Sequence, residues 1–122
     1  MPVQIKRVYD DAEKSDGLRV LVDRLWPRGL SKEDAQVDEW LKDVGPSKEL
    51  RQWFNHDPDK FDEFKKKYKK ELEDNEEQQE ELEKLKEWTI KHKKKLTLVF
   101  GAKDEENNQA VVLKEIMDRQ QV

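Results

Sequence analysis

Residues that could bind an anion or move a proton follow three apolar runs of the sequence. The runs are VQIKRV (3–8), LRVLVDRLW (18–26) and LTLVF (96–100). The polar residues at or just after their ends are Arg7, Tyr9, Asp10, Asp23, Arg24, Arg28, Lys103, Asp104 and Asn108. Guanidinium and ammonium groups bind phosphate and carboxylate groups, and a carboxyl group can act as a general acid or base. If the runs form parallel strands, these side chains meet at the carboxyl edge of the sheet, where ligands of open α/β folds bind.

A structural role for the same residues is the alternative. Asp23 with Arg24, or Asp10 with Arg7, could pair and hydrogen-bond to loop carbonyls, because polar groups at strand ends need partners. Both interpretations stay open for each single residue. We expect Arg28, which follows a proline into a turn, to contact a ligand, and Asp23 to be mainly structural.

The segments around these residues predict alternating strands and helices. Each apolar run is short and rich in branched residues, which is typical of a strand. Capping residues and helical spacing predict helices over 31–44, over 47–54, from 57 onward, and from Asn107 or Asn108 to the end. The apolar stripe of the long charged segment lapses at 74–81, so we expect a bend or break and loose packing there.

Together these elements predict a single α/β domain over residues 1–122. A small three-stranded, largely parallel sheet is packed by helices, and a long charged helical region precedes the last strand. About ten residues link the first two strands, near the minimum for a parallel crossover, so their relative direction stays open. We expect Trp26, Trp40, Trp53 and at least one of Phe61 and Phe64 to be mostly buried.

Composition limits the classes of partner. With 25 basic and 29 acidic residues the formal net charge is −4, so no global positive field favours nucleic acid or an anionic membrane. No apolar run approaches the length of a membrane span or signal peptide, and we expect a cytoplasmic protein without a membrane partner. The oligomeric state is left undefined.

The sequence offers little for metal or cofactor chemistry. It has no cysteine and two histidines, so a transition-metal cage is not expected, although carboxylate-bound magnesium is left open. Neither a serine elbow nor a glycine-rich phosphate loop is present, and we expect no cofactor. His92 lies in a basic run typical of a surface. His56 lies between two helices, where it could cap carbonyls or titrate near neutrality.

The order of several motifs resembles the YeaO-like family of bacterial domains of unknown function (DUF488). The motifs are IKRVYD, RVLVDRLWPRG, DEWLKDVGPSKELRQWF, HDP, FKKKYKKEL and LTLVFGAKDEENNQAVVL. The resemblance covers nearly the whole chain and implies a small cytoplasmic α/β domain, but it brings no established activity.

The resemblance also implies a set of polar family positions. They fall on Arg7, Tyr9, Asp10, Asp23, Arg24, Arg28, Asp38, Ser47, Arg51, His56, Lys103 and Asn108. Ser47 and Arg51 are the additions to the residues chosen from the strand ends. Where the family often has tyrosine and serine at the end of the last strand, this chain has Phe100 and Gly101, so neither hydroxyl can be obligatory here.

Two functional hypotheses follow. In the first, the domain binds a phosphate- or carboxylate-containing ligand at a basic strand-end rim, with enzymatic activity left open. Its ligand-binding candidates are Arg7, Arg24, Arg28, Ser47, Arg51, Lys103 and Asn108, and its acid or base candidates are Asp10, Asp23 and His56. In the second, the domain is a non-enzymatic module that binds nucleic acid or protein through its long charged helices.

Overall fold

The computed structural model describes residues 2–120 and contains a four-stranded parallel sheet. The strands are β1 (Gln4–Arg7), β2 (Leu18–Leu21), β3 (Glu39–Trp40) and β4 (Leu96–Phe100), in the order β1-β4-β2-β3. Every strand pair is parallel, so the first two strands run in the same direction with β4 between them. All five β4 residues are buried, as expected for a central strand covered on both faces.

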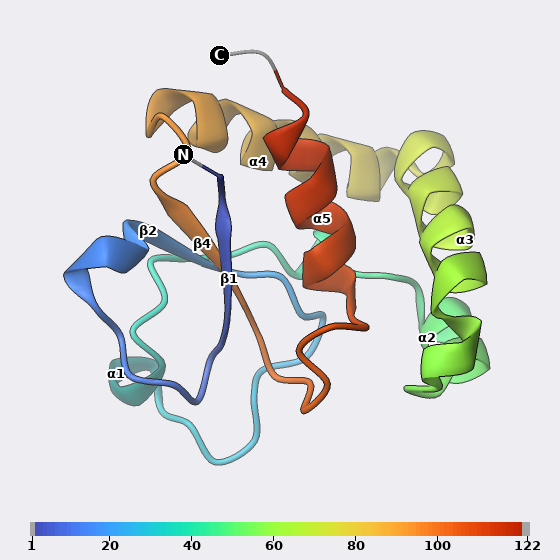
Figure 1. Cartoon of the computed structure of the whole chain (residues 1–122), viewed down its shortest axis with the longest axis horizontal. Helices are drawn as coiled ribbons and strands as arrows, with labels where there is room; N and C mark the ends of the chain where they lie inside the picture. Colours follow the sequence, from blue (N-terminus) through green and yellow to red (C-terminus); the bar gives the residue numbers. More distant parts are fainter. Residues whose placement is uncertain (1, 121–122) are drawn as a thin grey trace.

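Helices pack on the sheet and extend to one side of it (Figure 1). They are α1 (Lys32–Ala35), α2 (Lys48–Phe54), α3 (Phe61–Asp74), α4 (Glu76–Lys91) and α5 (Gln109–Asp118). Short 3-10 turns occupy Lys14–Asp16, Lys42–Val44 and Pro58–Lys60. None of the helices within residues 2–120 is long and apolar enough to cross a membrane.

The two faces of the sheet have separate apolar clusters. Val20, Leu98 and Phe100 pack into the large core with side chains of α2 to α5. Leu21 and Val99 point to the opposite face, because side chains alternate along a strand. The loop after β2 and helix α1 cover this second face. The predicted α/β class is therefore confirmed, with one strand more than expected.

The additional strand replaces most of the helix predicted over 31–44. Ser31 caps α1 as expected, by accepting a hydrogen bond from the Asp34 amide, but the helix ends at Ala35 because Gln36 is left-handed (φ 49°). The chain then pairs with β2, and the Asp38 carboxylate accepts a hydrogen bond from the Arg19 amide at 2.9 Å. Pairing with β2 outweighed the helical spacing of this segment, so the prediction was wrong.

The same change corrects the predicted burial of Trp40. Its side chain is 39% exposed, and its ring contacts Trp26 edge-on with centroids 5.3 Å apart. Phe61 and Phe64 are buried as predicted, while Trp26 and Trp53 are partly buried and pack against the two cores. Trp40 was predicted to be buried because its spacing placed it on the apolar face of a helix that does not form.

The predicted break in the long charged region occurs at Asn75, between α3 and α4. Asn75 caps α4 by accepting a hydrogen bond from the Gln78 amide. Gln78 is only 1% exposed, and its Nε2 donates to the Gly45 carbonyl at 3.0 Å and to Glu71 at 3.1 Å. A buried amide therefore anchors the segment, which lacks an apolar residue to do so.

The chain between Val44 and Pro46 is held by side chains from three segments. Tyr68 of α3 donates its hydroxyl to the Val44 carbonyl at 2.5 Å. Gln78 of α4 donates to Gly45, and Arg24 Nε donates to both Gly45 (3.1 Å) and Pro46 (2.8 Å). We call these bonds the carbonyl clamp. It connects the end of β2 to the pair of long helices.

Tyr68→Phe should lower the free energy of unfolding by about 1 to 3 kcal/mol, because it leaves the buried Val44 carbonyl without the hydroxyl donor. Burial also raises the pKa of Tyr68 well above its usual value, so the proton stays available to donate. Urea unfolding measures the change. Tyr9→Phe is the matched control, since it removes an exposed hydroxyl and should change stability by less than about 0.5 kcal/mol. Equal effects of the two variants would contradict the importance of the clamp.

Candidate functional site

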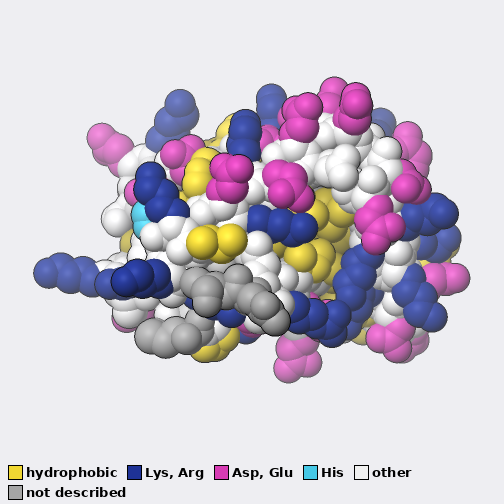
Figure 2. Space-filling view, turned by 90° about the horizontal axis from the view of Figure 1, so that it is seen from above, with side chains coloured by type: hydrophobic (Ala, Val, Ile, Leu, Met, Phe, Trp, Pro, Cys, Tyr) yellow, Lys and Arg dark blue, Asp and Glu magenta, His cyan; other side chains and the backbone are white. Residues whose placement is uncertain are grey.

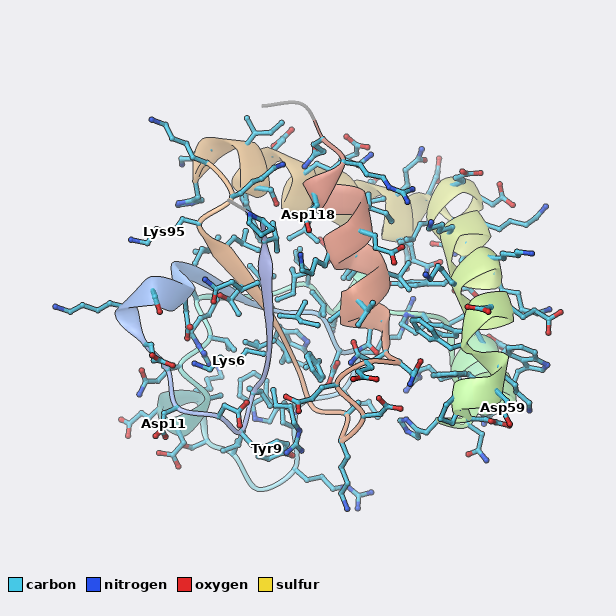
Figure 3. All side chains as sticks on the ribbon, in the orientation of Figure 1. Lys6, Tyr9, Asp11, Asp59, Lys95 and Asp118 are labelled. Atoms are coloured by element: carbon cyan, nitrogen blue, oxygen red, sulfur yellow. The ribbon has the colours of Figure 1, made fainter. Side chains whose placement is uncertain are left out.

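A cavity of about 240 Å³ opens at the carboxyl end of the strands. This end of the sheet is marked in Figure 3 by Tyr9, which follows β1, whereas Lys95 precedes β4 at the opposite end. Three segments distant in sequence meet there: the turn after β2, the end of α2, and the loop into α5. The lining residues are Asp23, Arg24, Leu25, Pro46, Arg51, Phe54, His56, Phe64, Ala102, Asn107, Asn108 and Gln109. We call this space the rim cavity.

Asp23 is the carboxyl group of the rim cavity. One oxygen accepts a hydrogen bond from the Gly101 amide at 2.8 Å, and the other accepts one from the Gln109 side chain. Burial raises the pKa of Asp23 to about 6, although both hydrogen bonds and the charges of Arg51 and His56 act in the opposite direction. The expected structural role is present, since Asp23 joins β2 to the β4–α5 loop. The carboxyl group can also exchange a proton near neutral pH.

Gly101 lets the β4–α5 loop approach this carboxyl group. A Cβ atom at position 101 would lie 3.1 Å from the Asp23 oxygen, closer than ordinary van der Waals contact. A side chain at this position would therefore force the Asp23 carboxylate, which accepts the hydrogen bond from the Gly101 amide, to shift.

Arg51 supplies a cation that the protein does not fully pair. It lies on α2, which Ser47 caps by accepting a hydrogen bond from the Leu50 amide. Arg51 Nε is buried and has no hydrogen-bond acceptor within the protein. An unpaired buried donor costs about 1 to 3 kcal/mol, and more for a charged group. Arg51 also lines the rim cavity, so this cost falls on a residue of the cavity wall.

Arg24 is held mainly by contacts within the protein. Its Nε belongs to the carbonyl clamp, and its Nη1 lies 3.8 Å from the Asp43 carboxylate. Arg24 nevertheless lines the rim cavity and adds positive potential to it. Arg24 therefore has contacts of the structural kind, and its role toward a ligand stays a prediction.

His56 enters the cavity through an uncommon backbone conformation. Asn55 (φ 47°) and His56 (φ 54°) are consecutive left-handed residues, a region that Asn and His tolerate better than most side chains. The Asn55 amide ends α2 by donating to the Arg51 carbonyl. The backbone of Asn55 thus provides the cap, and the His56 ring lies beside Phe54 with centroids 6.4 Å apart.

The structure brings only part of the predicted site together. Asp23, Arg24, Arg51, His56 and Asn108 line the rim cavity. Asn108 is buried and caps α5, accepting hydrogen bonds from the Ala110 and Val111 amides. Its side chain is therefore occupied by the protein.

The other candidates lie outside the cavity lining. Arg7 donates to the carbonyls of Gly101 and Ala102 at 3.3 and 3.0 Å, and so supports the loop behind the cavity. Ser47 donates its hydroxyl to Glu71 and lines a neighbouring groove. The exposed candidates outside the lining are Asp10, Arg28 and Lys103.

Sequence reasoning did not select Gln109 or the aromatic residues of the cavity wall. Gln109 is the first residue of α5, directly after the predicted cap, which was the available signal. Phe54 and Phe64 belong to the large core, and they also form part of the cavity wall. Within residues 2–120 no group of three or more His, Cys, Asp or Glu side chains could hold a metal ion.

Comparison with known proteins identifies the family. Residues 2–121 match the family described as the inactive DUF488-N3 subclade. The chain belongs to this DUF488 family. YeaO of Escherichia coli, an uncharacterized protein, is 44% identical over 113 residues, which cover 93% of this chain and 94% of YeaO. The resemblance seen in the sequence is therefore confirmed.

Mycobacterial relatives align over a shorter region of this DUF488 chain. The uncharacterized proteins Rv3073c of Mycobacterium tuberculosis and Mb3100c of Mycobacterium bovis are each 56% identical over 66 residues. The aligned region spans 54% of this chain and 56% of each of those proteins. No solved structure matches the chain.

Asp23→Asn should stabilise the protein above pH 6 and have little effect near pH 4. The folded pKa of Asp23 is raised to about 6, whereas an unfolded aspartate titrates near about 3.9. Between these values the folded state holds a proton that the unfolded state has lost, so wild-type stability falls as pH rises from about 4 to about 6. The variant should lack this loss and gain at most about 3 kcal/mol at pH 8.

Urea unfolding of both proteins at several pH values measures this difference. Asp10→Asn removes an exposed carboxyl group outside the cavity and serves as the matched control. A wild-type stability that tracks that of the Asp23 variant across this pH range would contradict the proton uptake at Asp23.

Proposed function

We propose that this DUF488 domain binds a small anion, a carboxylate or phosphate group, in the rim cavity. The buried Arg51 Nε without a protein acceptor is the observation that carries the proposal. Arg24 lines the same cavity and adds to its positive potential. A bound anion would supply the missing acceptor and form a charge-assisted hydrogen bond, which is among the stronger polar contacts in proteins.

The charges of the long helices support this site over a nucleic-acid surface. Lysine and glutamate side chains on α3, α4 and α5 lie close together, as in Lys65 with Glu115 at 3.0 Å and Lys86 with Glu83 at 3.4 Å. Figure 2 shows basic and acidic side chains intermixed over the face that it views. Mixed charges of this kind provide no continuous basic track for a phosphate backbone.

A binding role fits this site better than a catalytic one. The family is described as an inactive subclade. The lining residues include no serine, threonine, cysteine or lysine, which are the side chains that most often act as nucleophiles. Asp23 and His56 share the cavity, and we assign them to ligand recognition.

Arg51→Met should weaken binding of phosphate or acetate about tenfold or more, because it removes the unpaired guanidinium and a charge-assisted hydrogen bond of about 1.5 to 3 kcal/mol. The same variant should not lower the free energy of unfolding by more than about 1 kcal/mol, since Nε has no protein partner to lose. Calorimetric titration and urea unfolding measure the two effects.

Lys103→Met and Arg28→Met make the same change in net charge at exposed positions outside the cavity lining. Both should keep the wild-type affinity. Loss of binding in Arg28→Met but not in Arg51→Met would move the site to the turn after β2. If no anion binds and duplex DNA binds with a steep dependence on salt, the interaction-module hypothesis replaces this proposal.

A further inference from the structure

We propose that the ligand of the rim cavity is a small aromatic or heteroaromatic monocarboxylate, with its carboxylate on Arg51 and its ring against the apolar wall. This inference rests on the proposed anion-binding function and narrows it to one chemical class. Three properties of the cavity support it: the chemistry of its walls, its size and its balance of charge.

Aromatic and apolar side chains form one side of the cavity. Phe54 of α2 and Phe64 of α3 are stacked with ring centroids 4.3 Å apart, and both line the cavity. His56 lies beside Phe54, and Pro46 adds a further flat apolar surface. Phe54 is 6% and Phe64 1% exposed, so a planar ligand ring would pack edge-on against them, which adds about 0.5 to 1.5 kcal/mol to the burial of its area.

Leu25 extends this apolar surface to the mouth of the cavity. It is 69% exposed although it lies between Arg24 and the partly buried Trp26. A ligand with a hydrophobic body would cover part of this side chain, whereas an inorganic anion would leave it in water. Contact with Leu25 would therefore distinguish a ligand with a hydrophobic body from an inorganic anion.

The volume of the cavity limits the ligand to about one ring with a substituent. At about 240 Å³ it holds the equivalent of roughly eight water molecules, each with a share of about 30 Å³. It is smaller than the roughly 300 to 1,000 Å³ typical of sites for drug-sized ligands. A nucleoside triphosphate or an extended polyanion is therefore too large for the cavity and would extend out of it.

The balance of charge favours a single negative charge. Arg24 is bonded to two carbonyls and lies near Asp43, so Arg51 is the cation with an unsatisfied buried donor. Asp23 lines the same cavity and would repel a dianion when it is ionised. A planar carboxylate also matches the fork of a guanidinium group, which can donate two parallel hydrogen bonds.

The test is NMR titration of the full chain with benzoate, cyclohexanecarboxylate, acetate and inorganic phosphate at constant pH and ionic strength. Benzoate should bind at least about tenfold more tightly than acetate, and more tightly than cyclohexanecarboxylate, which has the same charge but a non-planar ring. All carboxylates should shift the Arg51 Nε–H resonance. Benzoate alone should also shift the Leu25 methyl and Phe54 ring resonances through its ring current.

Two variants separate the contributions. Arg51→Met should weaken binding of both benzoate and acetate about tenfold or more. Leu25→Ser, at an exposed position where folding is not at risk, should weaken benzoate several-fold and leave acetate unchanged.

The failures of this inference and of the proposed function are distinguishable. If acetate and phosphate bind through Arg51 and benzoate binds no more tightly, anion binding stands and the aromatic carboxylate is wrong. Equal affinity for benzoate and cyclohexanecarboxylate also overturns the aromatic assignment. If none of the four anions shifts the Arg51 resonance, both proposals fail.

Discussion

The carbonyl clamp is the interaction on which the arrangement of the rim depends. Tyr68, Gln78 and Arg24 come from α3, α4 and the turn after β2, and they converge on the carbonyls of residues 44–46. Burying a peptide carbonyl without a donor is costly, so these contacts fix the chain between β3 and α2 relative to the long helices. The position of α2, and with it Arg51, follows from this attachment.

The two arginines of the cavity differ in their hydrogen-bond partners. Arg24 is held by backbone carbonyls, and its guanidinium is part of the support of the fold. Arg51 lines the same cavity, and its buried Nε has no hydrogen-bond acceptor in the described part of the protein. A buried polar group without a partner is rare in folded proteins, and under our proposal a bound anion accounts for the one on Arg51.

Asp23 also lowers the stability of the folded protein, and it lines the same rim cavity. A buried carboxyl group with a pKa near 6 destabilises the folded state at neutral pH relative to a neutral residue. It nevertheless links β2 to the β4–α5 loop through Gly101 and Gln109. Structural and functional interpretations are therefore not exclusive for this residue, and one side chain positions the loop while it sets the charge of the cavity.

Helix ends and strands that depend on short-range interactions could be predicted from the sequence alone. Capping by Ser31, Ser47 and Asn108 and the break at Asn75 follow from hydrogen bonds between residues two or three positions apart. Apolar runs likewise located β1, β2 and β4, and some of the polar residues after them line a cavity at the carboxyl edge of the sheet.

Which of those polar residues share the cavity could not be predicted from the sequence, and it follows from the tertiary structure. Glu39 and Trp40 joined β2 against their helical spacing, because strand pairing depends on a distant partner. Arg28 and Lys103 stayed exposed, whereas Gln109 reached Asp23 across 86 positions of sequence. Whether a cation is paired, exposed or aimed into a cavity depends on contacts between residues far apart in the chain. Local patterns carry no information about such contacts, so the unpaired nitrogen of Arg51 could be found only in the folded protein.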